Sequence, residues 1–305
     1  MKAFDFYAAK DANDAVALLA QHAADPKVRV KVIAGGTDLL ADWKFSPHGP
    51  DVVVDISRAE ELKTITLTEQ GLVIGALVTH TQIMRSPLIQ QMFPALVHAA
   101  HTIGAVQTRN RGTLGGNLVT AVPSMDSGPT LMALEAIVTI AGWGGRRQVP
   151  LSEFFVGPRK TILKPDELLA EIIIPKANLG KPTHFYKFGL RKGQALALVN
   201  AAASFWVDWG KNTFVAARIS LGAVAPKVIR ATQAEAFLEG RTITPEAMAE
   251  AGRVAVNDAR PISDFRASAE YRKNLVAVLT KRCLEGAWAL AQTKRVEGSN
   301  GNRNA

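Results

Sequence analysis

The alternation of apolar and polar positions predicts one helix and two strands in the first part of the chain. Residues 12–24 place apolar side chains at helical spacing, and Asn13 or Asp14 suits the N-cap of that helix. Residues 28–36 alternate and then become apolar, and residues 51–57 form a second short run rich in Val. Helix and strands in this arrangement predict a small parallel sheet that ends near residue 57.

The segment 58–177 changes from strands to helices and back. A hairpin is predicted with its turn at Glu69–Gly71. Residues 86–104 have the periodicity of a helix, and a Gly-rich loop follows them. A further helix over about 127–134 leads to strands, of which the last is an apolar run closed by Pro175.

The C-terminal part has strands first and helices afterwards. Three strands are predicted at residues 183–193, 196–208 and 213–226, and the turn "DWGKN" joins the last two as an antiparallel hairpin. Helices are predicted at residues 232–240, 244–258 and 268–292. Thr244 suits an N-cap and Pro245 the first helical position. A three-stranded antiparallel sheet backed by helices accounts for this order.

Composition restricts the class of protein. With 305 residues and 48% apolar side chains, the chain is long enough for more than one folded part. No apolar run reaches the length of a membrane span, and the N-terminus lacks the apolar core of a signal peptide. We therefore expect a cytoplasmic protein, with export in a complex whose other subunit carries a signal as the alternative. The net charge of +9 is dispersed, which argues against a nucleic-acid groove.

Metal-binding residues are sparse. The only cysteine, Cys283, cannot form an internal disulfide or hold an iron–sulfur cluster, and its helical context predicts a small core residue. His98 and His101 are three residues apart without a carboxylate or cysteine nearby in the sequence, so we predict no metal site there.

Two Gly-Gly loops are the strongest signal of chemistry. One is "VIAGGTDLL" at residues 32–40, and the other is "NRGTLGGNLVT" at residues 110–120. Neither is a dinucleotide fingerprint or a P-loop. Glycines after a strand let successive backbone amides point toward one anion, and Thr37 and Thr113 add hydroxyl groups. The pair predicts a clamp on a diphosphate; the alternative is two ordinary tight turns.

Four motifs in the same order resemble the FAD-binding subunit of the molybdenum hydroxylases, the xanthine dehydrogenase, carbon monoxide dehydrogenase and aldehyde oxidoreductase group. They are the first loop, the second loop extended through "TAVPSMDSGPTLMAL", then "FFVGPRKTILKPDELLAEIIIP", then "FYKFGLRKG". The runs "LGAVAPKVIRA" and "RPISDFRASAEYRKNLV" extend the resemblance to the C-terminal region, and they look closest to bacterial xanthine dehydrogenase subunits.

The resemblance implies an α+β fold of the p-cresol methylhydroxylase type, with FAD between two subdomains and a C-terminal antiparallel sheet with helices after them. The implied parts are 1–57, 58–177 and 182–292, followed by a disordered tail at 293–305. Two positions depart from the pattern: Pro158 stands where purine-oxidising relatives often have an aromatic residue, and Ile103 where some have Phe.

The resemblance also implies the cofactor contacts. The FAD-binding positions it implies are Lys31, Val32, Ile33, Ala34, Gly35, Gly36, Thr37, Asp38, Leu39, Ile103, Gly104, Thr113, Gly115, Gly116, Asn117, Thr120, Asp126, Leu169 and Lys187. Among them, Asp126 would hold an adenosine-side hydroxyl group, and Lys187 would lie beside the flavin ring. The alternatives are a helix cap for Asp126, an exposed strand position for Lys187, and core for Leu169.

By this resemblance the chain is an oxidoreductase subunit with no catalytic residue for the organic substrate. A large partner with molybdopterin would oxidise a purine, aldehyde or N-heterocycle, and a small partner with two [2Fe–2S] clusters would pass the electrons to FAD in this chain. NAD⁺, O₂ or a quinone would accept them, and the complex would be a heterotrimer or a dimer of heterotrimers. The alternatives are a stand-alone flavin oxidase, a UDP-sugar enolpyruvyl reductase of related fold, and a non-catalytic anion-binding scaffold.

Overall fold

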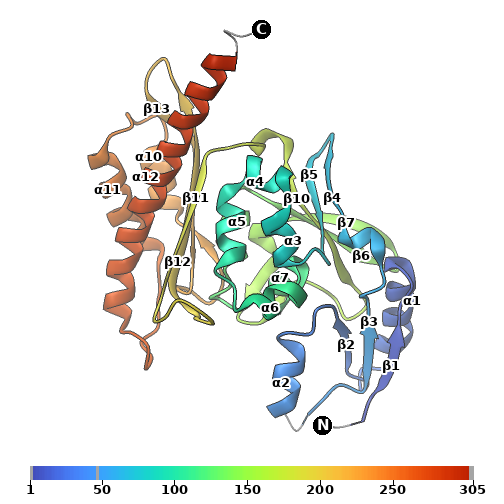
Figure 1. Ribbon diagram of the computed structural model, residues 1–305. Coiled ribbons are helices and arrows are strands. Elements are labelled where there is room, and N and C mark those ends of the chain that lie inside the picture. Colours follow the sequence, from blue (N-terminus) through green and yellow to red (C-terminus); the bar gives the residue numbers. More distant parts are fainter. Residues whose placement is uncertain (1–2, 46–47, 302–305) are drawn as a thin grey trace. The chain divides into compact units, whose positions relative to one another are not determined.

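The computed structural model describes residues 3–45 and 48–301, which form two compact units (Figure 1). Unit 1 comprises Met1–Arg85, Ile103–Val122 and Glu135–Leu179, and unit 2 comprises Ser86–Thr102, Pro123–Leu134 and Gly180–Ala305. These units differ from the divisions expected at residues 57 and 177. Two segments from the middle of the chain belong to unit 2 because their helices pack on its sheet.

Unit 1 begins with the small parallel sheet that the sequence predicts. Its strand order is β1 (Asp5–Ala8), β3 (Val52–Asp55) and β2 (Val30–Ile33), and α1 (Ala12–Ala23) packs on it through buried Val16 and Leu19. The strand β1 was not predicted. The cap of α1 is Asp11, whose carboxylate accepts a hydrogen bond from the Asp14 amide, so the prediction of Asn13 or Asp14 was wrong.

A second sheet of unit 1 is antiparallel and confirms the predicted hairpin. Its order is β4 (Ile65–Thr68), β5 (Gly71–Gly75), β10 (Leu168–Pro175), β6 (Ile137–Gly142) and β7 (Gly145–Pro150). The strand β10 lies in the centre of the sheet and is mostly buried, which explains why Glu171 is its only charged residue.

Short elements complete unit 1. They are α2 (Leu39–Phe45), η1 (Glu60–Lys63), α3 (His80–Arg85), α6 (Val106–Arg111), α7 (Leu114–Thr120), α9 (Leu151–Phe154), η2 (Lys176–Asn178) and the two-stranded sheet of β8 (Phe155–Gly157) and β9 (Lys160–Thr161).

Unit 2 is built on an antiparallel sheet in the order β11 (Thr183–Gly189), β12 (Ala197–Asp208), β13 (Thr213–Gly222) and β14 (Ile229–Arg230). The hairpin of β12 and β13 is confirmed. The sequence predicted three strands and missed β14, which has only two residues and therefore leaves no periodic pattern.

Helices cover both faces of the sheet of unit 2 (Figure 1). One layer contains α10 (Thr232–Leu238), α11 (Pro245–Ala255), η3 (Val256–Asp258) and α12 (Ala269–Gly301). The other contains α5 (Pro94–His101) and α8 (Ser127–Ala133), whose alanines pack against Phe185 and Ala202 of the sheet.

Residues 86–104 do not form one helix. The helix α4 (Pro87–Met92) ends before Pro94, and α5 starts there, because proline has no N–H to donate the backbone hydrogen bond that would continue the helix. The Thr244 cap of α11 is confirmed.

The long helix α12 corrects the expected C-terminal tail. It continues through Gly301, whereas residues 302–305 lie outside the described part of the chain. Side-chain contacts hold the helix at positions where composition suggested disorder: Lys294 donates a hydrogen bond to the Gly180 carbonyl at 2.6 Å, and the Arg295 guanidinium lies over the Trp209 ring at 4.4 Å.

Cys283 is a core residue of unit 2, as predicted. Its side chain on α12 is fully buried, and its thiol donates a hydrogen bond to the Ala201 carbonyl at 3.2 Å. Burial raises the pKa of this thiol above its ordinary value. Among the described helices, none has the length and apolar character that crossing a bilayer requires. The same residues contain no group of His, Cys, Asp and Glu suited to a metal ion.

Candidate functional site

The first Gly-Gly loop presents a row of unpaired backbone amides. It connects the end of β2 at Ile33 to the start of α2 at Leu39. Within residues 3–45 and 48–301, no acceptor is found for the amides of Gly35, Gly36 and Thr37. Gly36 has a φ of +71°, a conformation that glycine adopts without strain. Three successive amides without an acceptor are the donors that the anion-binding prediction for this loop requires.

The second loop uses its amides differently. The Leu114 amide donates to the Val78 carbonyl at 2.8 Å, and the Gly115 amide to the Ala76 carbonyl at 2.9 Å. The Gly116 amide donates to the Thr113 hydroxyl, which caps α7, at 3.0 Å. The expectation that both loops offer a nest of free amides is therefore wrong for the second one.

The two glycines of the second loop have separate structural roles. A β-carbon on Gly115 would lie 2.6 Å from the β-carbon of Ala76, so this glycine allows α7 to pack closely on the sheet. A β-carbon on Gly116 would meet only the Thr113 hydroxyl, at 2.9 Å, and no other atom within 4 Å. The Gly116 side of α7 is therefore open and can accept a bound group.

The two loops meet and form one surface within unit 1. A β-carbon on Gly35 would lie 1.9 Å from the Arg111 carbonyl oxygen, so the backbones are in direct contact there. The Thr120 hydroxyl donates to the Gly116 carbonyl at 2.8 Å, and its oxygen lies 3.4 Å from the Asp38 carboxylate. These contacts place the free amides of residues 35–37 and the second loop on one surface, as the paired-loop prediction requires.

A buried histidine supports the junction of the loops. His80 at the start of α3 is 2% exposed, and its backbone amide donates to the Gly112 carbonyl at 3.2 Å. Burial, with the nearby positive charge of Arg109 as a smaller cause, lowers the pKa of His80 to about 4. No partner for His80 Nδ1 is found in the described part of the chain. The ring is therefore neutral at pH 7. The sequence gave no signal for this residue.

Arg109 holds the segment that the resemblance places near the flavin. Its guanidinium donates to the Ile103 carbonyl at 2.9 Å. Gly104 follows with a φ of +50°, and a β-carbon there would lie 2.8 Å from the Thr108 side chain. The conformation at Ile103–Gly104 is thus fixed by Arg109 and by the absence of a side chain on Gly104.

Asp126 and Lys187 form a buried ion pair in unit 2. Lys187 Nζ lies 2.5 Å from Asp126 Oδ2 and also donates to the Thr102 carbonyl at 3.0 Å, and both side chains are 8% exposed. The Asn200 amide, which the sequence analysis missed, donates to Asp126 Oδ1 at 3.0 Å and to the Met125 carbonyl at 2.9 Å. Asp126 precedes α8 but its carboxylate does not cap it. Asp126 is therefore not a side-chain cap of the helix, and Lys187 is not an exposed strand residue.

The charge state of this pair depends on burial. Burial raises the pKa of Asp126 to about 6, opposed by the positive charge and hydrogen bond of Lys187 and by hydrogen bonds from Asn200 and Thr102. At neutral pH the carboxylate is ionised and neutralises the lysine, so unit 2 holds a compensated pair of charges in its interior.

The remaining predicted positions differ in accessibility. Leu169 is buried in β10, as its core alternative requires, while Lys31 is exposed on β2. Near the motif that contains Pro158, Arg159 has a φ of +55° and pairs with the Asp42 carboxylate of α2 at 2.7 Å. This ion pair connects α2, which follows the first loop, to the β8–β9 hairpin.

Two family matches cover almost the whole chain. Residues 2–177 match the family described as "FAD binding domain in molybdopterin dehydrogenase". Residues 184–287 match the "CO dehydrogenase flavoprotein C-terminal domain". The class of protein defined by the first match, which spans both Gly-Gly loops, is a flavoprotein.

Individual relatives extend over nearly the full length. The chain is 33% identical over 286 residues to the carbon monoxide dehydrogenase medium chain of Hydrogenophaga pseudoflava, covering 94% of this chain and 97% of that one. It is 34% identical to the nicotinate dehydrogenase FAD-subunit of Eubacterium barkeri, covering 92% and 95%.

Solved structures agree in fold. A structure of carbon monoxide dehydrogenase from Hydrogenophaga pseudoflava matches with a TM-score of 0.88 at 34% identity, covering 95% of this chain and 98% of that one. Quinoline 2-oxidoreductase from Pseudomonas putida 86 matches with a TM-score of 0.86 at 32% identity, covering 95% and 100%. The chain belongs to the FAD-binding medium subunits of the molybdenum hydroxylases, and is an oxidoreductase subunit.

Proposed function

We propose that the first Gly-Gly loop and the open side of Gly116 hold the diphosphate part of FAD. The observation that carries this proposal is the row of free amides at Gly35, Gly36 and Thr37 beside a second loop whose own amides are already paired. Backbone donors without a Cβ between them suit a diphosphate, which has many acceptor oxygens and negative charge. The residues present therefore fit the cofactor of this family.

When bound, FAD supplies a centre that accepts electrons one at a time and delivers two. The residues of this chain hold and tune it. The amides of the first loop bind the diphosphate. The hydrogen bond from Arg109 to the Ile103 carbonyl keeps the segment 103–104 in place. The amide of neutral His80 supports the Gly112 carbonyl, and its ring adds no charge. The resemblance places Lys187 beside the ring, where a cation stabilises reduced flavin; its ionised partner Asp126 moderates that charge.

We propose further that the chain acts in a heterotrimer. A small subunit with two [2Fe–2S] clusters supplies electrons, a large subunit with molybdopterin oxidises a purine, aldehyde or N-heterocycle, and NAD⁺, O₂ or a quinone accepts electrons from this chain. Relatives named as medium chains or FAD-subunits of dehydrogenases, at coverage above 90% of both chains, support this arrangement.

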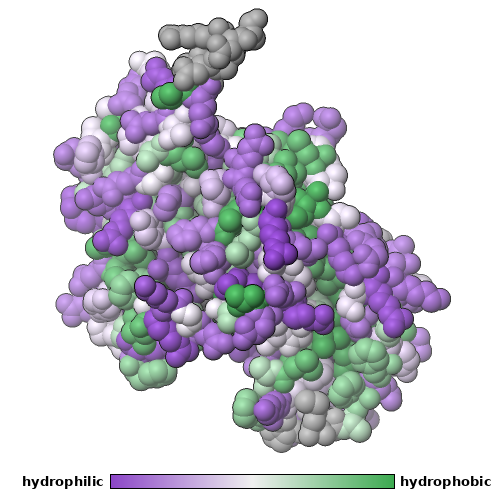
Figure 2. Space-filling model, viewed as in Figure 1, coloured by the Kyte–Doolittle hydropathy of each residue, from purple (hydrophilic) through white to green (hydrophobic). Residues whose placement is uncertain are grey.

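Exposed apolar side chains support a subunit that binds partners. In unit 1, hydrophobic residues gather over α2 and the N-terminal strands (Figure 2), where Phe6 and Leu40 are exposed and Phe45 is 84% exposed. In unit 2, Ile262 is exposed and Phe265 is 92% exposed. Large apolar groups left in water at such positions are typical of surfaces that another chain covers.

The proposal is tested by purifying the protein from its own host and recording a visible spectrum and a gel. We expect flavin bands, broader iron–sulfur absorbance, and two further chains, one large and one small. Flavin without partner chains would contradict the heterotrimer and favour a stand-alone flavin enzyme. A colourless protein that takes up no added FAD would contradict the cofactor site.

A further inference from the structure

The segment of unit 2 that connects η3 to α12 leaves two large apolar side chains in water. It comprises residues 259–268, in which Ile262 is 68% exposed and Phe265 is 92% exposed. Unit 2 buries neither side chain in its own core. The internal packing of the unit therefore does not explain why these positions are apolar.

Polar contacts hold this segment in one conformation. The Asp264 carboxylate accepts hydrogen bonds from the Arg266 amide at 2.9 Å and from the Ala267 amide at 3.3 Å. Arg272 on α12 donates to the same carboxylate at 2.9 Å and to the Leu198 carbonyl of β12 at 2.7 Å, and it is 3% exposed. The segment is thereby fixed to the sheet, and its apolar side chains are presented in fixed positions.

The apolar surface continues onto the start of α12. Tyr271 and Val278 are both exposed and lie about two helical turns apart, so they share one face of the helix. The Ser263 hydroxyl accepts a hydrogen bond from the Ala269 amide at 2.8 Å, which keeps the segment against this end of the helix. The four exposed apolar residues are termed the α12-start patch: Ile262, Phe265, Tyr271 and Val278.

Cations without a carboxylate partner accompany the patch. Arg260, Lys273 and Arg282 are exposed, and within residues 3–45 and 48–301 no carboxylate lies within ion-pair distance of any of them. Glu270 is an exposed carboxylate in the same region. The balance of the unpaired charges is positive, so the patch complements an apolar surface with a negatively charged border.

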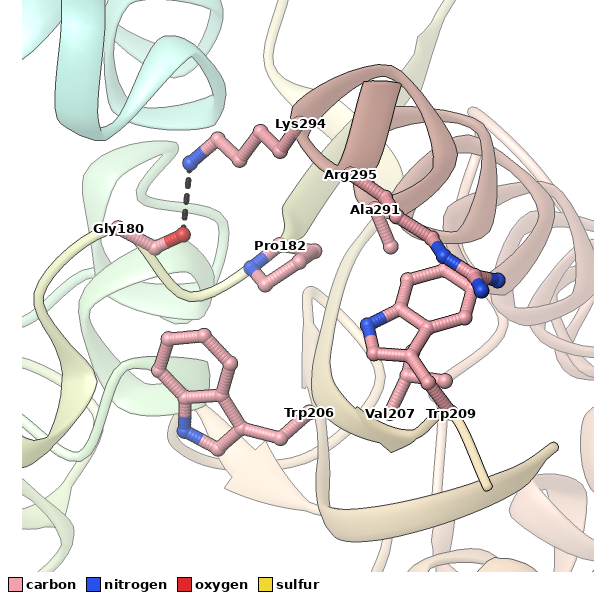
Figure 3. Close-up of a pocket in the computed structure, with 8 residues that line it drawn as sticks. All are labelled: Gly180, Pro182, Trp206, Val207, Trp209, Ala291, Lys294 and Arg295. Atoms are coloured by element: carbon pink, nitrogen blue, oxygen red, sulfur yellow. Dashed lines mark hydrogen bonds between the residues drawn. The ribbon is translucent and has the colours of Figure 1, made fainter. Parts of the chain in front are cut away.

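The opposite end of α12 differs, because its cations are already engaged. Figure 3 shows a hollow there in which Lys294 and Arg295 point to different sides. Lys294 donates to the Gly180 carbonyl, and Arg295 lies over the Trp209 ring. The groups of that hollow are used within unit 2, whereas the apolar side chains and cations at the start of the helix are not.

We infer that the α12-start patch docks a partner chain whose surface has an apolar pocket for Phe265 bordered by Asp or Glu side chains. The inference rests on the proposed heterotrimer, and it names the surface of this chain and the chemistry of the partner. An aromatic anchor that is ordered before binding loses little freedom on association, and opposite charges around it increase the association rate. A second copy of this chain fits less well, because two equal patches would bring like charges together.

The complex purified from its own host tests the location of the contact. A carbodiimide joins a lysine amine to a carboxylate that it touches, so we expect a link from Lys273 to an Asp or Glu of a co-purified chain. Lys211, which is exposed in the β12–β13 turn of the same unit, is the control and should give no such link. Hydrogen exchange at residues 260–271 should be slower in the complex than in the FAD-loaded chain alone, with no difference at residues 209–212.

Two substitutions at exposed aromatic residues measure the affinity. Phe265→Ser removes the anchor, and Trp143→Ser, in the β6–β7 turn of unit 1, is the control. Both side chains are exposed, so flavin content and thermal stability should stay unchanged. We expect partner chains isolated from the native complex to bind Phe265→Ser about 10-fold or more weakly and Trp143→Ser within about 2-fold of the unchanged chain.

The charges are tested separately through kinetics. The double variant Arg260→Gln with Lys273→Gln should bind the isolated partner chains with a lower association rate, and this rate should depend less on salt concentration. An unchanged rate at every salt concentration would overturn the acidic border of the partner.

The outcomes distinguish this inference from the proposed function. Partner chains that bind Phe265→Ser as tightly as the unchanged chain, or equal exchange at residues 260–271 with and without them, would overturn the docking surface and leave the heterotrimer intact. A chain that purifies from its host without partner chains would overturn both. Self-association of this chain that Phe265→Ser abolishes would assign the patch to a second copy and overturn the acidic partner.

Discussion

The Arg111 carbonyl oxygen lies 1.9 Å from the point that a β-carbon on Gly35 would occupy. The first Gly-Gly loop can therefore approach the second only because residue 35 has no side chain. The sequence analysis gave a different reason for the glycine, namely that successive backbone amides can then point toward one anion. The structure assigns close packing to Gly35 and free amide donors to the loop as a whole.

Gly35→Ala should separate the two loops. Because the clash is with backbone, relaxation is costly, and we expect unit 1 to lose about 2–4 kcal/mol of unfolding free energy together with its FAD. Thermal unfolding and the ratio of flavin to protein absorbance measure the two effects. Full flavin content at unchanged stability would contradict the close contact of the loops.

Gly116→Ala should separate cofactor binding from stability. Its β-carbon meets only the Thr113 hydroxyl, and alanine favours a helix, so the change in unfolding free energy should stay below about 1 kcal/mol. The added methyl group occupies the open side of α7, and we expect FAD to bind about 10-fold more weakly. Gly144→Ala, in the β6–β7 turn with no atom within 4 Å, is the control and should change neither property. Unweakened FAD binding in Gly116→Ala would remove this face of α7 from the site.

Lys187→Met should destabilise unit 2 by about 3–5 kcal/mol, since Asp126 would remain buried without its partner. The double variant Lys187→Met with Asp126→Asn removes both charges and should recover most of that loss. Without Lys187 the pKa of Asp126 rises further, so the defect of the single variant should grow as the pH increases above about 6. Denaturant titrations at several pH values measure this; equal stability of the single and double variants would contradict a coupled pair.

The same lysine provides a redox test of the proposed function. If Lys187 stabilises reduced flavin, its replacement should lower the midpoint potential of bound FAD. The double variant also removes the Asp126 charge that moderates the cation, so its potential should fall less than that of the single variant. A potential equal to that of the unchanged protein in both variants would exclude Lys187 from the flavin environment.

His80 should make unit 1 sensitive to acid. Its folded pKa of about 4 lies below the ordinary value of 6.5, so the unfolded chain binds the proton more readily. This contribution to stability is complete above pH 6.5 and is lost as the pH falls toward 4, by up to about 3 kcal/mol. His80→Leu should reduce the slope of stability against pH in that window. His101→Gln, at an exposed position on α5, is the control and should leave the slope unchanged.

Sequence patterns predicted the regular elements well where a local signal marks the element. The helix α1, the hairpin of β12 and β13 and the Thr244 cap of α11 were all found, because each has a local signal. The strand β14 and the extension of α12 to Gly301 were missed, since contacts with distant residues, rather than local sequence, stabilise them.

For the candidate site, the sequence located the loops but not their division of roles. Gly-Gly at residues 115–116 has the same appearance as Gly-Gly at 35–36, yet its amides bond to Ala76, to Thr113 and, at the preceding residue, to Val78. His80 and Asn200 have no motif around them, and their importance is visible only from burial and from their partners.

Cys283 makes the protein convenient for labelling. Its thiol is buried, hydrogen-bonded to the Ala201 carbonyl and held protonated, so maleimide reagents will not reach it in the folded chain. A second cysteine introduced on any exposed residue will then be the only thiol that reacts. Fluorophores or spin labels can thus be placed one at a time on either unit, and distances across the whole protein measured, without altering a native side chain of the core.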